Sequence, residues 1–93
     1  MAVYVDPMFV TVPNERWPYM SACHLFTDGD EKELLTFAVG MGLELSWFQH
    51  RKTLPHFDLT RGMRAKALRL GAIPIEGREY GELLLRLVKE GHV

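Results

Sequence analysis

Cysteine is nearly absent from this sequence of 93 residues, and long apolar runs are missing altogether. The single cysteine, Cys23, cannot form a disulfide within the chain. An apolar run of about 20 residues would be needed to span a membrane, and no segment approaches even the shorter apolar core of a signal peptide. We therefore expect a cytoplasmic protein, kept in a reducing compartment, with no membrane partner.

The motifs that name a reaction are missing as well. The sequence contains no glycine-rich phosphate loop, no serine nucleophile elbow and none of the cysteine and histidine spacings typical of structural zinc sites. It has no DNA-reading motif, and a formal net charge of -1 gives no electrostatic reason to expect a nucleic acid or an anionic membrane as partner. Nucleic-acid binding is therefore not expected, and the sequence alone does not name a reaction.

The composition that is present is that of a folded protein. Hydrophobic residues make up 47% of the chain and charged residues 25%, as in ordinary soluble globular proteins. A chain of this length can bury one core but is too short for two independent ones. We predict a single domain over residues 1–93.

Runs of apolar residues predict strands that alternate with helices. Apolar and β-branched runs predict strands at 2–6, 22–27, 55–60 and 72–75, with a short edge strand at 9–12. Capping and stop residues predict helices from Asp30 to Gly42, from Thr60 to Gly71, and over 78–90 with Gly91 closing the last one. The predicted fold is one small α/β domain, with about four short strands and three helices packed mainly on one face. The pattern leaves the strand order open.

In the segment Pro55–Ala72, a short predicted strand with two polar residues is followed directly by a predicted helix. Side chains alternate along a strand, so His56 and Asp58 lie on one face while the neighbouring apolar residues lie on the other. Thr60 is a typical helix N-cap, and Arg64 follows in the first turns of that helix. Backbone N–H groups at a helix N-terminus, with an arginine, suit a phosphate or carboxylate. The segment therefore predicts an anion site, with Asp58 orienting His56 or Arg64.

Other polar side chains occupy matching positions on the remaining strands. Asp6 ends the first strand in step with Tyr4, His24 lies in the second, and Asp28 follows it. If these strands are neighbours, the polar side chains form one cluster with His56 and Asp58, although this depends on register. Imidazoles and carboxylates are ligands of zinc and manganese. A metal-dependent phosphodiesterase or nuclease is therefore a second interpretation of the same residues.

Purely structural interpretations stay open beside these two. Asp6 can cap the turn that begins at Pro7. Asp58 can pair with Arg64 across the strand–helix junction, with the histidines satisfied by local partners. In that case the chain is a structural or protein-interaction module with no catalytic activity.

Short motifs spread over the chain form a set: Val5-Asp6, His24-Leu25-Phe26-Thr27-Asp28, Phe48-Gln49, His56-Phe57-Asp58, Arg64, Ala67 and Gly71-Ala72. Together they resemble a family of small bacterial and phage proteins classed only as a domain of unknown function. The resemblance extends from Val3 through the last helix. Phe57 stands where that family usually has tyrosine, so no role of that hydroxyl is carried over. The resemblance implies a shared fold and a shared polar set, adds Gln49 to the candidates, and implies no activity.

These patterns predict a protein that binds a phosphate-bearing small molecule or nucleotide. The stronger version of this hypothesis is that the protein also hydrolyses that ligand. The candidates for catalytic roles are His56, Asp58 and Arg64. The candidates for ligand binding are Asp6, His24, Asp28, Gln49 and Thr60. A small anionic ligand is the expected partner, a divalent metal is a candidate cofactor without assigned ligands, and the oligomeric state is not predicted.

Overall fold

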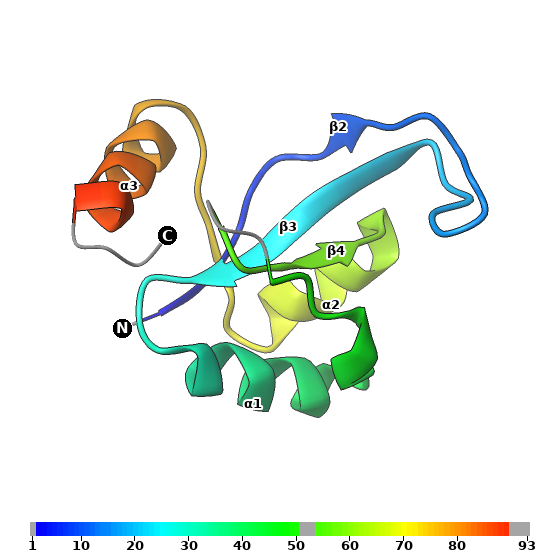
Figure 1. The fold of residues 1–93 in the computed structure, drawn as a ribbon, viewed down its shortest axis with the longest axis horizontal. Coiled ribbons are helices and arrows are strands. Elements are labelled where there is room, and N and C mark those ends of the chain that lie inside the picture. The colour runs from blue at the N-terminus through cyan, green and yellow to red at the C-terminus, as the bar shows by residue number, and fades with distance from the viewer. Residues whose placement is uncertain (1, 51–53, 90–93) are drawn as a thin grey trace.

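The computed structural model describes residues 2–50 and 54–89, which form a five-stranded sheet and three α-helices (Figure 1). In chain order the elements are β1 (Val3–Val5), β2 (Phe9–Val10), β3 (Ser21–Thr27), α1 (Glu31–Met41), the short 3₁₀ helix η1 (Leu45–Trp47), β4 (Phe57–Leu59), α2 (Arg61–Arg69), β5 (Ile73–Pro74) and α3 (Gly77–Lys89). The predicted α/β class and the order of the elements are confirmed. The predicted end of the last helix, at Glu90 and Gly91, lies outside the described residues.

The longest strand, β3, lies at the centre of the sheet. Its Leu25 pairs with Val5 of β1 and with Phe57 of β4, both antiparallel, so β1 and β4 lie along opposite edges of β3. The first residues of β3 pair antiparallel with β2, and β5 pairs parallel with β1. Pro74, which lacks a backbone N–H, lies in β5 at the end of the strand order, as the sequence predicts.

Alternation along the strands divides the core between the two faces of the sheet. One face packs against α1 and α2 through buried residues that include Val5, Leu25 and Phe57. Phe26 points the other way and packs against Leu83 and other residues of α3. Two of the three helices therefore cover one face, and α3 alone covers part of the other (Figure 1).

The helix ends follow from local chemistry. The Asp30 side chain accepts a hydrogen bond from the backbone N–H of Glu33 at 3.0 Å, and the Thr60 side chain accepts one from Met63 at 3.2 Å. Gly42 closes α1 with a φ of 88°, a left-handed conformation that glycine adopts without strain. The caps predicted at Asp30, Gly42 and Thr60 are confirmed.

None of the helices within the described ranges combines the length and the apolar character needed to cross a bilayer.

Candidate functional site

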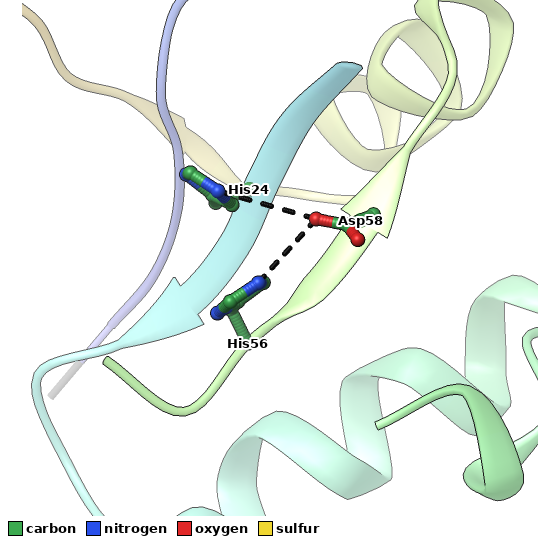
Figure 2. A group of neighbouring side chains, drawn as sticks. All are labelled: His24, His56 and Asp58. Atoms are coloured by element: carbon green, nitrogen blue, oxygen red, sulfur yellow. Dashed lines mark ion pairs between the residues drawn. The ribbon is translucent and has the colours of Figure 1, made fainter. Parts of the chain in front are cut away.

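Two histidines and one aspartate meet on the face of the sheet that α1 and α2 leave uncovered (Figure 2). His24 of β3 pairs in register with Asp58 of β4, and His56 directly precedes β4. The Oδ1 atom of Asp58 lies 3.4 Å from Nε2 of His56 and 4.0 Å from Nε2 of His24. His56 and Asp58 lie on the same face, as the strand alternation predicts, and the pairing of β3 with β4 brings His24 beside them.

His56 is oriented by its own backbone neighbourhood. Its Nδ1 atom lies 2.6 Å from the carbonyl oxygen of Leu54, and a carbonyl oxygen can only accept, so Nδ1 carries a proton. A backbone bridge to Gln49, with N···O distances of 2.9 and 3.1 Å, fixes the segment that holds the ring. The ring therefore directs Nε2 toward Asp58.

His24 is oriented by Asp6, a carboxylate that is only 3% exposed. The Nδ1 atom of His24 lies 2.6 Å from Oδ2 of Asp6, and the backbone N–H of His24 donates to Oδ1, also at 2.6 Å. The hydroxyl of Tyr80, on α3, donates to Oδ2 at 2.7 Å. The Asp6 side chain thus binds β3 and α3 instead of capping the turn at Pro7.

The protonation of Asp6 decides which nitrogen of His24 carries a proton. Burial alone raises the pKa of the Asp6 carboxyl, but the hydrogen bonds from His24 and Tyr80 outweigh burial and hold the pKa below its ordinary value. Asp6 is therefore ionised at neutral pH and accepts from Nδ1–H of His24. As in His56, Nε2 is the atom turned toward Asp58.

Asp58 is oriented in the same manner by an amide. The Nε2 group of Gln49 donates to Oδ2 of Asp58, which leaves Oδ1 facing the two histidines. Burial raises the pKa of Asp58, and the interactions with His56, Gln49 and His24 outweigh it, so the pKa lies below its ordinary value. Gln49, added to the candidates by the family resemblance alone, therefore belongs to the cluster.

A cavity of about 660 Å³ opens over this cluster. Its floor is polar and consists of His24, Gln49, His56 and Asp58. Its walls are apolar and consist of Phe9, Leu54, Leu84 and Val88. A ligand of small-molecule size can thus reach the polar atoms, since such pockets typically measure roughly 300–1,000 Å³.

The structure places the other predicted site residues elsewhere. The Nε atom of Arg64 donates to the backbone carbonyl of Asp6 at 2.9 Å, and Thr60 caps α2. Asp28 binds the backbone N–H of Ala2 at 2.7 Å, and its second oxygen lies 3.2 Å from Arg86. None of these three predicted residues lines the cavity. Within the described ranges no ion pair joins Arg64 to Asp58, so the structural pairing considered from the sequence does not form.

Sequence reasoning missed Tyr80 and the apolar wall residues. Tyr80 lies 74 positions from Asp6, and its spacing in the last helix fits a core position equally well. Phe9 reaches the cavity because β2 pairs with β3 beside His24, with ring centroids 4.9 Å apart. Only the strand order and the position of α3 could have identified these residues, and no local motif encodes either.

The three side chains turn toward one shared point. Oδ1 of Asp58 lies near Nε2 of both rings, and the interactions with His56 and His24 help to lower the pKa of Asp58, so positive charge at this point stabilises the carboxylate. A proton on a ring and a metal ion both supply such charge, and metal binding therefore competes with protonation.

Comparison with known proteins assigns the chain to a family. The profile described as "Protein of unknown function (DUF4031)" matches residues 3–87. The chain belongs to the DUF4031 family. The resemblance inferred from the sequence is thus confirmed, and the matched part of this DUF4031 chain contains the cluster and its hydrogen-bond partners from Asp6 to Tyr80. No curated protein and no solved structure gives a significant match.

Proposed function

We propose that this DUF4031 chain binds one divalent transition metal ion and holds a phosphate-bearing ligand on it. The protein ligands are Nε2 of His24, Nε2 of His56 and Oδ1 of Asp58. The observation that carries the proposal is that one possible ligand atom from each of these three residues lies within 4.8 Å of the other two, and that Oδ1 of Asp58 lies 3.4 and 4.0 Å from the two Nε2 atoms. Nδ1 of each ring and Oδ2 of Asp58 bind other partners behind the cluster. Nitrogen and carboxylate ligands suit zinc, and they also suit manganese and iron.

The distances are close to those of a coordinated ion. Zinc ligands about 2.0–2.1 Å from the ion in a tetrahedral site lie about 3.3 Å from one another. Asp58 Oδ1 lies 3.4 Å from His56 Nε2 and 4.0 Å from His24 Nε2.

The hydrogen bonds behind the three ligands also support a metal site. Histidines that bind a metal usually donate their other N–H to a carboxylate or a backbone carbonyl, which fixes the tautomer. His24 donates in this way to Asp6, and His56 donates to the carbonyl of Leu54. Each ring is thereby held in the form that can bind a cation through Nε2.

The phosphate part of the proposal follows from charge. No lysine or arginine lines the cavity in the part of the chain that the structure describes, and Arg64 is engaged with the Asp6 backbone. A metal ion held by His24, His56 and Asp58 would itself supply counter-charge for a phosphate in this cavity. This replaces the sequence-based expectation of an anion held by Arg64 and the α2 N-terminus.

Hydrolysis of the bound phosphate ester is the second part of the proposal. Three protein ligands leave a coordination position for water, as in catalytic zinc sites, and the ion lowers the pKa of such a water to about 7. The water gives one proton to solvent and its oxygen forms a bond to phosphorus. The bond from phosphorus to the ester oxygen breaks with its electron pair, and that oxygen takes a proton from solvent.

A thermal-shift experiment separates this proposal from a structural role. The wild-type protein, Asp58→Ala and the matched control Asp28→Ala are heated with EDTA, Zn²⁺, Mn²⁺ or Mg²⁺, each with and without inorganic phosphate. A ligand that binds only the folded state stabilises that state by about 2.7 kcal/mol when the ligand concentration is one hundred times its Kd. The proposal predicts a metal-dependent rise for wild type and Asp28→Ala that disappears in Asp58→Ala. The absence of any shift in wild type would favour the structural or protein-interaction module.

A further inference from the structure

We infer that the ligand is a phosphate monoester whose other part is a flat aromatic group, held by the apolar walls above the metal site. This inference deepens the proposed function and rests on it. The walls are built from three separate parts of the chain: Phe9 of β2, Leu54 before β4, and Leu84 and Val88 of α3. The polar floor and the apolar walls therefore call for a ligand with a charged head and an apolar body.

Phe9 is the wall residue best placed for stacking. Its ring centroid lies 4.9 Å from that of His24, with an interplanar angle of 37°, and 40% of Phe9 is exposed. His24 is also a proposed metal ligand, so a group joined to a phosphate on the metal would lie near the exposed Phe9 ring. Aromatic side chains beside an open cavity favour flat ligands, because rings stack on one another.

The part of the wall that α3 contributes is aliphatic and also accessible. Val88 is 57% exposed, and Leu84 lies one helical turn before it on the same face of α3. A flat ring between Phe9 and this helix would remove apolar surface from water on both of its sides. The cavity volume of about 660 Å³ leaves room for the ring together with a phosphate.

The charge of the cavity favours one phosphate over several. The Asp58 carboxylate lines the cavity, and the Asp6 carboxylate lies directly behind His24. Among the residues that the structure describes, no lysine or arginine lines the cavity. One divalent ion offsets one phosphate group well, and the described lining residues that are not proposed metal ligands include Phe9, Leu54, Leu84 and Val88, which suit an apolar group better than a second phosphate. The inference therefore favours aryl phosphates or nucleoside monophosphates over di- and triphosphates.

Calorimetry on the zinc-bound protein, without free metal, tests the inference with four probes: inorganic phosphate, methyl phosphate, phenyl phosphate and adenosine monophosphate. Stacking on an aromatic side chain favours the aryl probe, so we expect phenyl phosphate to bind at least about fivefold more tightly than methyl phosphate. Adenosine monophosphate shows whether a sugar between ring and phosphate is accepted.

Two variants test whether the Phe9 side chain causes the preference for phenyl over methyl phosphate. Phe9→Ala should reduce the preference for phenyl over methyl phosphate to less than threefold and leave the affinity for inorganic phosphate unchanged. The matched control is Val10→Ala, in the same strand, where the side chain is 87% exposed and lies outside the cavity lining. Val10→Ala should keep the full preference.

The outcomes distinguish this inference from the proposal beneath it. Equal binding of phenyl and methyl phosphate to the zinc-bound wild type would overturn the inference and leave the metal and phosphate site intact. An unchanged preference in Phe9→Ala would overturn the assignment of the ring to this wall. Failure of the protein to bind zinc would overturn the proposed function itself, and the inference with it.

Discussion

The buried carboxylate of Asp6 accepts from both the ring and the backbone of His24, with each N···O distance at 2.6 Å. Asp6 directly follows β1 and His24 lies in the middle of β3, so this pair links the two strands. It also fixes the tautomer of the ring and directs Nε2 toward Asp58. The same contact therefore holds the sheet together and prepares a candidate metal ligand.

Replacing Asp6 with asparagine should weaken zinc binding without abolishing the fold. Asparagine has one accepting oxygen where Asp6 uses two, so its NH₂ group must face either Nδ1–H or the backbone N–H of His24, and the ring is no longer held as Asp6 holds it. Loss of such an outer partner typically costs about 10–100-fold in metal affinity, and we expect a change of that size by calorimetry. Unfolding in guanidinium should show a loss of about 1–3 kcal/mol.

The matched control for that variant is Asp28→Asn. Asp28 also accepts several hydrogen bonds, from Ala2 and Tyr4, but it lies outside the cavity lining. We expect its zinc affinity to stay within twofold of wild type. A tenfold loss in Asp28→Asn, or none in Asp6→Asn, would contradict the role assigned to the Asp6–His24 pair.

Stability should fall in acid because the folded state holds carboxyl pKa values below the ordinary range. This applies to Asp6, Asp28 and Asp58, in each of which hydrogen bonds outweigh the effect of burial. Between the folded pKa and the unfolded value of about 3.9, the unfolded chain binds more protons, so the free energy of unfolding rises with pH. The contribution is complete above about pH 5 and is lost as the pH falls through the folded values.

Guanidinium titrations of the metal-free protein from pH 7 to pH 2 measure this slope. Asp6→Asn should remove part of it, because one of the three carboxyls no longer titrates. A free energy of unfolding that stays constant or increases as the pH falls from 5 to 2 would contradict the account.

Thr60→Ala should affect stability alone. The Thr60 side chain accepts from the backbone N–H of Met63 at 3.2 Å and lies outside the cavity lining. Loss of an N-cap typically costs about 1 kcal/mol, which denaturant unfolding can detect. Zinc and phosphate affinities should not change, and a loss of phosphate affinity would restore the anion site that the sequence suggested at this helix end.

Cys23 should be chemically inert in the folded protein. Its side chain is fully buried, and burial, together with the nearby Asp6 carboxylate, raises the pKa of its thiol to about 12. A thiol-reactive dye should therefore label the native protein only as fast as it unfolds, and label it at once in guanidinium. Rapid labelling in native buffer would mean that β3 opens far more readily than a central strand should.

The sequence predicts best what local chemistry determines. The N-caps at Asp30 and Thr60 and the opposite orientation of Asp58 and Phe57 depend on residues close in the chain, and the structure has them as predicted. The meeting of His24 with Asp58 depended on two strands being neighbours in the correct register, which alternation alone cannot decide. Arg64 was the least predictable, because its chemistry suits an anion but a backbone carbonyl 58 positions away binds it.

The central claim, that His24, His56 and Asp58 bind a metal ion together, is tested most directly by titrating zinc into the metal-free protein at neutral pH. Calorimetry should give one ion per chain for wild type. His24→Ala, His56→Ala and Asp58→Ala should each weaken binding at least a hundredfold while circular dichroism stays that of a folded protein. No zinc binding by wild type, or equal affinity in wild type and all three variants, would contradict the account.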